Sequence, residues 1–442
     1  MDAKVKEYDH TGQYPGKPKS KRTREYKKLL SEWKEDAKNR APDTKIYYEG
    51  FVIIFGSAKP MAKDLDKVWL ADAAHCTGPL KGMTYNIVAC SANRNLVRIA
   101  FGHIMASESK ETWEKIGKAV GNEFGTGFLS KITILCDGAK GLEALAPSMG
   151  AKSFRCSNHF VENVPPMGKK IFLDMTRART PGDVEKLRKT LDEKSKNYLS
   201  KFPNDELFVA YNHEVWRHKT QSGVESENSR NKRSMIRASS PFEMIRLVLN
   251  SEKTAYNGHK STANETQTHV PGRILALLND IKAKSSRYSV VQAETGSTST
   301  YNVTTIGKPG REARVTITLD NGLIYRCSCK RPSIFRFPCW HVGAVCAKEP
   351  AKYDITRFVS ASETTEMMRK QYEPEFKIPD VFLSSYDRDE TLQVPLITAP
   401  QTGRPKSGKR FKSQRERNPT KSTHPFEGRL VCPHKRRRRN GA

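Results

Sequence analysis

The sequence has no long apolar segment and few acidic residues. No run approaches the roughly 18 consecutive apolar residues that a membrane-spanning helix needs, and no apolar stretch near its beginning has the form of a secretion signal. The 48 Asp and Glu residues are outnumbered by 77 Lys and Arg, so the formal net charge is +29 over 442 residues. These deficits argue against a membrane or secreted protein and favour a polyanion as the partner. We expect a soluble, intracellular protein.

Nine cysteines in a chain of this length do not suggest a disulfide scaffold. Four residues of metal-ligand type nevertheless fall within the fifteen-residue stretch CSCKRPSIFRFPCWH. They are Cys327, Cys329, Cys339 and His341. Structural zinc is bound by four thiolate or imidazole groups in a tetrahedron, and three cysteines with one histidine are a common set. We expect one structural Zn²⁺ at these residues, whereas Cys346, one turn further on, should lie in the core.

The residues around this stretch predict a strand hairpin followed by a helix. Residues 313–319 alternate apolar with polar side chains, and Asn321-Gly322 is the strongest short hairpin signal. Because residues two apart on a strand face the same side, the first two cysteines can hold one ion together. The alternative, that the cysteines are small buried side chains, does not account for four ligand residues so close together. The spacing C-x-C-x9-C-x-H resembles the SWIM-type zinc finger.

The middle of the chain has the element order of a ribonuclease-H-like α/β core. We expect strands at 67–72, 85–90 and 96–105, a helix at 109–124, a strand at 131–137, a helix at 139–149 and a strand at 151–156. In that fold the first and fourth strands are parallel neighbours, and ligands bind at the carboxyl ends of such strands. Asp72 and Asp137 would then meet in one cleft.

Two facing carboxylates repel each other unless a cation lies between them. A pair of divalent ions can activate water and stabilise a leaving oxygen at phosphorus. The alternative is that each aspartate is only a turn or capping residue after a strand. Because both occur in this strand order, we favour a catalytic site that binds Mg²⁺ or Mn²⁺ at Asp72 and Asp137.

Residues 69–116, 132–145 and 156–163 together resemble the transposase domain of Mutator-like elements (MULE). That resemblance implies an Asp-Asp-Glu triad on a ribonuclease-H-like fold, a helical insertion before the glutamate, and a SWIM finger downstream. It covers about 50–345 of the chain. One departure is that Ala73 follows the first aspartate, where the family usually has glycine.

The resemblance also implies a third carboxylate and a Cys-His pair. The family's glutamate lies in a T-S-N-x-x-E-S-x-N stretch, and TQSGVESEN at 220–228 matches it with Glu225 as the third catalytic metal ligand. Glu227 is the alternative in a shifted register, and a solvated glutamate on a polar helix is another. The family's C-x-x-H pair matches Cys156 and His159, for which a structural or substrate-facing role is expected.

The domain organisation follows from these assignments. We expect a basic arm at 1–45, a MULE-type core at 46–258 with a helical insertion at about 161–217, a connecting segment at 259–285, a SWIM zinc-finger domain at 286–350, mixed helix and loop at 351–398, and a basic disordered tail at 399–442. Residues 402–442 alone hold fourteen Lys and Arg against two Glu. Such ends are typical of solvated polymer that also contacts phosphates and directs nuclear import.

The expected function is that of a DNA transposase in the nucleus. It would cut and join DNA strands with divalent metal ions at Asp72, Asp137 and Glu225, and copies could associate with one another on DNA ends. The alternative is a domesticated, catalytically inert transcriptional regulator of the far-red-impaired-response type, since those plant proteins combine the same MULE and SWIM parts.

Overall fold

The computed structural model of the chain describes residues 45–48, 50–77, 82–138, 141–213, 215, 222–239, 241–296, 298–307, 312–319 and 323–376. Residues 1–44 of the expected basic arm and the whole expected tail at 399–442 therefore lie outside the described residues. Among the helices that are described, none is long and apolar enough to cross a membrane.

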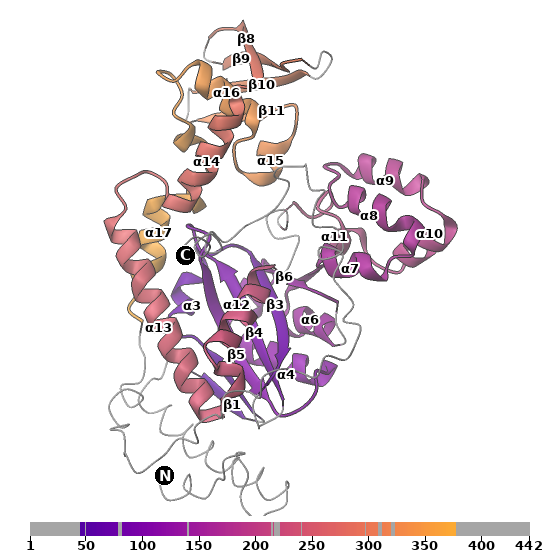
Figure 1. The fold of residues 1–442 in the computed structure, drawn as a ribbon, viewed down its shortest axis with the longest axis vertical. Coiled ribbons are helices and arrows are strands. Elements are labelled where there is room, and N and C mark those ends of the chain that lie inside the picture. The colour runs from indigo at the N-terminus through magenta and orange to yellow at the C-terminus, as the bar shows by residue number, and fades with distance from the viewer. Residues whose placement is uncertain are drawn as a thin grey trace, which may run out of the picture. The chain divides into compact units, whose positions relative to one another are not determined.

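Seven strands form one mixed sheet in the order β1-β2-β5-β4-β3-β6-β7 (Figure 1). The strands are β1 (Lys45–Tyr48), β2 (Phe51–Ile54), β3 (Val68–His75), β4 (Met83–Cys90), β5 (Leu96–Ile104), β6 (Thr133–Cys136) and β7 (Lys152–Arg155). Neighbours pair antiparallel from β1 to β3 in this order, whereas β6 pairs parallel with both β3 and β7. The mixed α/β organisation agrees with the prediction. The β1–β2 hairpin, which lengthens the sheet beyond β5, is not evident from the sequence pattern.

The strand that carries the first aspartate is longer than predicted. The expected strand ends at Asp72, but β3 continues to His75 because β4 pairs with it as far as Met83. The helix expected at 139–149 is shorter. Its described helical residues are those of η1 (Leu142–Ala144) and α6 (Leu145–Met149).

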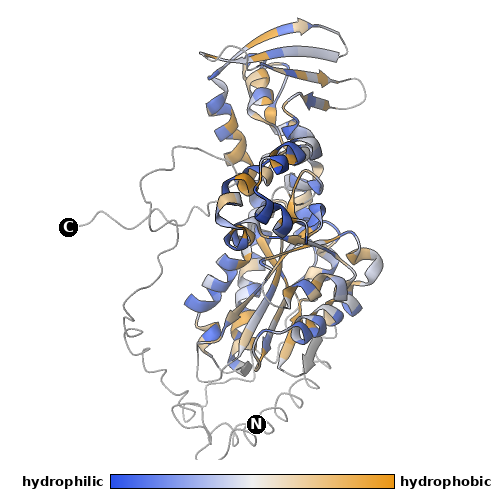
Figure 2. Ribbon diagram, turned by 90° about the vertical axis from the view of Figure 1, so that its right-hand side faces the viewer, coloured by the Kyte–Doolittle hydropathy of each residue, from blue (hydrophilic) through white to orange (hydrophobic). Residues whose placement is uncertain are grey.

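Helices cover both faces of the sheet, whose strands are largely apolar (Figures 1 and 2). Trp69 of β3 packs in the larger core with the apolar side of α4 (Lys110–Phe124). The next residue along β3, Leu70, packs on the opposite side with Val224 of α12 (Ser222–Arg233). This alternation follows from the two-residue period of a strand. Ser109 begins α4 as predicted, because its Oγ accepts a hydrogen bond from the backbone N–H of Thr112.

A helical segment follows β7. Its elements are α7 (Ser157–Asn163), η2 (Pro166–Gly168), α8 (Lys169–Met175), α9 (Pro181–Lys189), α10 (Glu193–Leu199) and α11 (Asn204–Leu207). Phe160, Phe172 and Phe208 lie in a hydrophobic core of this segment's own. The segment is therefore stabilised largely by contacts within itself.

A second, smaller sheet follows η4 (Ile236–Ala238), α13 (Pro241–Glu265) and α14 (Gly272–Ser285). Its antiparallel strands, in the order β11-β10-β9-β8, are β8 (Tyr288–Glu294), β9 (Thr298–Thr305), β10 (Glu312–Thr318) and β11 (Ile324–Cys327). The predicted pairing of the last two strands is confirmed, with Val315 opposite Cys327. Two short helices come next, α15 (Arg331–Phe335) and α16 (Trp340–Lys348).

The chain then returns to the main core through η5 (Ile355–Phe358), η6 (Ala361–Glu363) and α17 (Thr365–Tyr372). Met368 and Tyr372 of α17 are buried in the same hydrophobic core as Trp113 of α4. The Gln371 side chain accepts a hydrogen bond from the N–H of Ala92 and donates one to the carbonyl of Asp64. The segments that precede and follow the second sheet in the sequence are thus both anchored to the main core. The expected mixture of helix and loop at 351–398 does not include this return to the core.

Met368→Ala should destabilise the protein by about 2–4 kcal/mol, because it removes a fully buried side chain and leaves a cavity. Urea denaturation followed by circular dichroism measures the change. The exposed neighbour Glu366 provides a control, since Glu366→Ala should change the free energy of unfolding by less than about 0.5 kcal/mol. Equal effects of the two substitutions would mean that α17 is not part of the core.

Candidate functional site

The four predicted zinc ligands are brought together by the end of β11 and the start of α16. Cys327 is the last residue of β11, and Cys329 follows two residues later. Cys339 is the N-cap of α16, with an extended backbone, and His341 lies in the first turn of that helix. This irregular first position lets two ligands only two residues apart face the same point. Cys346, on the same helix, is buried in the core as predicted.

The loop between the two ligand pairs reverses the chain. Lys330 and Arg336 flank α15, and both adopt left-handed backbone conformations, with φ of 58° and 50°. Such conformations are uncommon for residues other than glycine and persist where the surrounding structure enforces them. They turn the chain back so that the second ligand pair meets the first.

The geometry of the cluster fits a tetrahedral zinc ion. One ligand atom from each of the four residues lies within 4.8 Å of every other. His341 Nδ1 lies 3.5 Å from Cys327 Sγ and 4.0 Å from Cys339 Sγ. Zinc bonds of about 2.3 Å to sulfur and about 2.0 Å to nitrogen separate tetrahedral ligand atoms by about 3.5–3.8 Å. The His341 ring also packs edge-on against Tyr288, which fixes its orientation.

The protonation of the three thiols also fits a bound cation. Hydrogen bonds from the Cys327 and Cys339 side chains hold the pKa of Cys329 well below its usual range. The hydrogen bond to Cys329 raises the pKa of Cys327 to about 12, and burial raises that of Cys339. One thiolate is therefore favoured without a cation, and only a metal ion makes three adjacent thiolates favourable together.

Residues 313–349, from β10 to just beyond α16, match the family model of the SWIM zinc finger. No curated protein matches the chain. The chain therefore carries a SWIM zinc finger domain at 313–349, and the Cys/His cluster inside it supports one structural zinc ion.

A second candidate site lies on the face of the main sheet that α12 covers. Leu70 of β3 pairs with Leu135 of the parallel strand β6. Asp72 comes two residues later on β3 and Asp137 two residues later, directly after the end of β6, so the register brings both residues to the same end of neighbouring strands. The predicted meeting of these two residues is consistent with this register.

Helix α12 approaches β3 closely at its first turn. A Cβ added to Gly223 would lie 2.6 Å from Leu70 Cδ1, so a larger residue here would require the Leu70 side chain to move. Glu225 is exposed on this turn, and its Oε1 lies 3.6 Å from His159 Nε2 of α7. From the next turn, Asn228 Nδ2 donates a 2.7 Å hydrogen bond to Asp72 Oδ2.

The pKa values of Asp72 and His159 show that the charged groups of this site interact. Burial, followed by the nearby charge of Asp137, raises the pKa of Asp72 from 3.8 to about 7, and Glu225 adds to the effect. A hydrogen bond with Cys156 and the charges of Asp137 and Glu225 raise the pKa of His159 to about 9. Among the described residues, however, only the zinc-finger cluster has three or more ligand atoms within 4.8 Å of one another, so the three carboxylates are more widely spaced.

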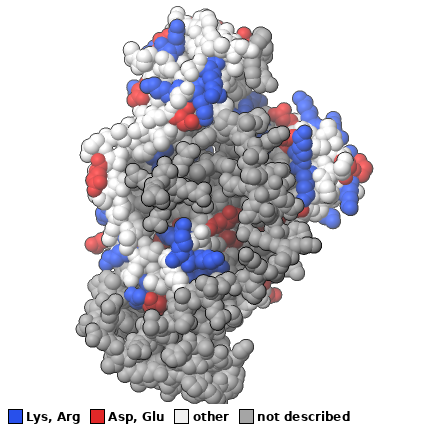
Figure 3. Space-filling model, in the orientation of Figure 1, with Lys and Arg blue, Asp and Glu red and all other residues white. Residues whose placement is uncertain are grey.

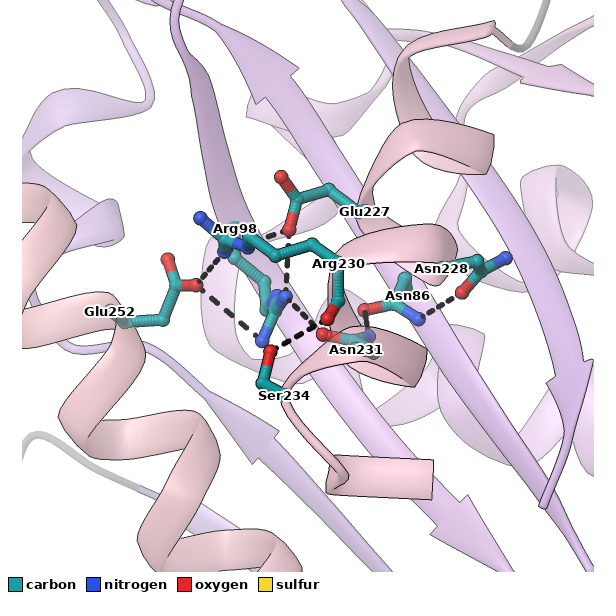
Figure 4. A network of polar contacts seen from close by, with 8 residues as sticks. All are labelled: Asn86, Arg98, Glu227, Asn228, Arg230, Asn231, Ser234 and Glu252. Carbon is teal, nitrogen blue, oxygen red and sulfur yellow. Dashed lines mark hydrogen bonds and ion pairs between the residues drawn. The ribbon is translucent and has the colours of Figure 1, made fainter. Parts of the chain in front are cut away.

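Glu227, the alternative third carboxylate, has a different environment. It is buried, and its Oε2 lies 2.8 Å from Arg98 and 2.7 Å from Arg230 (Figure 4). Residues two apart on a helix point in nearly opposite directions. Glu227 is therefore engaged in buried ion pairs, while Glu225 lies beside His159.

Sequence reasoning missed Glu108, a further carboxyl group close to the second site. Its Oε1 accepts a 2.8 Å hydrogen bond from Trp113 Nε1. Burial raises its pKa, and the charge of Asp137 adds to the effect. No sequence signal distinguishes it, since it lies in the loop directly before α4.

Cys329→Ser should remove the zinc and the order of the finger. Metal analysis of the full chain should give one zinc per molecule in the wild type and a large loss in the variant, because structural zinc contributes on the order of 10 kcal/mol to folding small modules. Cys346→Ala should keep the zinc, because Cys346 of α16 is buried in the core and is not one of the four ligands. A folded, zinc-free wild-type protein would contradict the assignment.

Asp72→Asn should stabilise the protein at pH 8 in the absence of added Mg²⁺ or Mn²⁺. Because the pKa of Asp72 is about 7 in the fold and 3.8 when unfolded, the ionised carboxylate disfavours folding. That cost is absent well below pH 4, grows as the pH rises to about 7 and is constant above it. We expect a gain on the order of 1–2 kcal/mol at pH 8 that shrinks toward pH 4.

Thermal unfolding across this pH range measures the effect, with Asp205→Asn, at an exposed position, as the control. A gain for Asp72→Asn that does not change with pH would show that Asp72 has an ordinary pKa.

Proposed function

We propose that this chain is a Mutator-like DNA transposase whose mixed α/β part is a ribonuclease-H-like core. Asp72, Asp137 and Glu225 would be its metal ligands. The observation that carries the proposal is the parallel pairing of β3 with β6, which sets Asp72 and Asp137 side by side under α12. The helical segment between β7 and α12 corresponds to the insertion that the family resemblance implies before its glutamate.

The charge distribution supports this proposal. Acidic side chains lie near the centre of the face in Figure 3, over the region where β3, β6 and α12 meet in Figure 1. Burial, and after it the nearby charge of Asp137, raises the pKa of Asp72, so the two ionised carboxylates disfavour each other. Divalent ions bound by such carboxylates would activate water and neutralise charge at the phosphorus.

The chain's own residues would prepare the site for those ions. Asp72 and Asp137 are held by neighbouring strands, so their separation is set by the sheet. Glu225 is exposed at the start of α12, and it is the only one of the three proposed ligands that a helix supplies. Its Oε1 lies 3.6 Å from His159 Nε2, and its charge acts on the pKa of Asp72.

DNA as the partner is supported by the excess of Lys and Arg, which gives a net charge of +29. The nuclear location and association of copies on DNA ends belong to the same proposal. The zinc finger would be a structural part of this protein, because its four cluster residues complete a closed tetrahedral set.

Asp72→Asn, Asp137→Asn and Glu225→Gln should each lower DNA cleavage at least about a hundredfold, because each removes charge that stabilises the transition state. The assay mixes the protein with DNA that carries the inverted-repeat ends flanking its own gene copy, with Mg²⁺ or Mn²⁺. New 3′-hydroxyl ends and joined products are measured. Glu143→Gln, at an exposed position of η1, should cut like the wild type.

DNA binding should be unchanged in all four variants. A wild-type protein that binds DNA but never cuts it with either metal would favour the transcriptional regulator instead.

A further inference from the structure

A continuous row of buried polar side chains lies between α12 and the sheet (Figure 4). The strands contribute Asn86 of β4 and Arg98 of β5, and α12 contributes Asn228 and Asn231. Each of the four is at most 7% exposed. Buried polar groups are costly unless they are paired, so their arrangement is strongly determined.

The row is linked by hydrogen bonds from Arg98 to Asp72. Arg98 Nη2 donates to Asn231 Oδ1 at 3.0 Å, and Asn231 Nδ2 donates to Asn86 Oδ1 at 3.3 Å. Asn86 Nδ2 then donates to Asn228 Oδ1 at 2.8 Å. Asn228 Nδ2 completes the row by donating to Asp72 Oδ2 at 2.7 Å.

The direction of this row is set by the chemistry of its first member. A guanidinium group has only donors, whereas an amide has a donor end and an acceptor end. Asn231 must therefore turn its oxygen toward Arg98 and its NH₂ toward Asn86, and the same orientation passes to Asn86 and Asn228. At the far end, an N–H and not a carbonyl meets the carboxylate of Asp72.

Arg98 is itself held in place by opposite charges. Its Nη2 lies 2.8 Å from Glu227 Oε2, and its Nη1 lies 3.4 Å from Glu252 Oε1 of α13. Arg230 Nη2 contacts the same two glutamates, at 2.7 Å and 2.5 Å. This buried cluster fixes the start of the row, because removing one partner would leave an uncompensated charge.

We propose that Asn228 is a positioning residue for Asp72, and that Arg98, through Asn231 and Asn86, fixes the orientation in which Asn228 holds that carboxylate. The proposal rests on the proposed function in one respect, that Asp72 binds a divalent ion. The Asp72 carboxylate accepts hydrogen bonds from Asn228 at Oδ2 and from the backbone N–H of Ala73, so its orientation is restrained before any ion binds. Positioned ligands of this kind depend on the hydrogen bonds that support them.

A purely structural role for the row gives a different expectation. If the asparagines only fill the space under α12, their replacement lowers stability but leaves the folded site unchanged. If they position Asp72, replacing Asn231, which is linked to Asn228 through Asn86, weakens ion binding in the folded protein. Once Asn228 itself has been replaced, replacing Asn231 as well should have no further effect on ion binding.

The test compares Mn²⁺ binding by wild type, Asn228→Leu, Asn231→Leu and the double variant, measured as free Mn²⁺ by electron paramagnetic resonance. Leu has the branched shape of Asn but a larger volume, adds no charge and makes no hydrogen bond. Mn²⁺ prefers carboxylate oxygens, so the zinc-loaded thiolates do not compete. Asn257→Leu, at an exposed position of α13, and Asp72→Asn, which removes the ligand, are the controls.

Asn228→Leu should weaken Mn²⁺ binding about tenfold, and Asn231→Leu about threefold or more, in line with the loss seen when supporting hydrogen bonds of metal ligands are removed. The double variant should bind no more weakly than Asn228→Leu alone. Asn228→Ser, which keeps a donor, should recover part of the affinity. DNA cleavage should fall in the same order, with the DNA concentration for half-maximal rate unchanged.

Two results would overturn the inference while leaving the proposed function intact. One is an Asn231→Leu variant that is folded and binds Mn²⁺ like the wild type. The other is a double variant whose loss equals the product of the two single losses. If Asp72→Asn binds Mn²⁺ as well as the wild type does, the metal site of the proposed function fails and the inference falls with it. Should Asn231→Leu not fold, Asn231→Ala replaces it in the comparison, because alanine also removes both hydrogen bonds, and the same non-additivity is expected.

Discussion

The parallel pairing of β3 with β6 is the constraint on which the candidate catalytic site depends. It joins Val68–Leu70 to Thr133–Leu135 without offset, so Asp72 and Asp137 emerge at one height. Parallel strands need a crossover connection between them, and here it contains α4. The crossover covers the opposite face of the sheet and leaves the face with the aspartates for α12. A shift of one residue in this register would turn one aspartate to the other face.

The rotation of α12 about its axis follows from what lies beneath it. Asp72, Asn86 and Arg98 form a polar stripe across three neighbouring strands, and a helix can cover it only with matching polar groups. Asn228 and Asn231, three residues apart, supply these groups on one side of α12. That requirement, together with the Gly223 contact, leaves Glu225 at the edge of the site and Glu227 in the buried ion pairs.

The sequence predicts what is local and fails where distant segments meet. The zinc ligands lie within fifteen residues, so spacing alone defines the cluster between Cys327 and His341. The choice between Glu225 and Glu227 is different, because α12 is polar on almost every side and has no apolar period to orient it. The return of α17 to the core depends on Gln371 meeting Ala92 and Asp64, a contact that no local pattern encodes. Glu108 is missed for the same reason.

The two candidate metal sites place opposite demands on the fold. At the finger, three thiols and an imidazole converge in a buried cluster that a zinc ion would complete, so binding and folding favour each other. At the sheet, ionised Asp72 is disfavoured by burial and by Asp137, and the surrounding structure must hold it there. The buried ion pairs of Arg98 and Arg230 with Glu227 and Glu252 lie behind that site and fix α12 against β5 and α13.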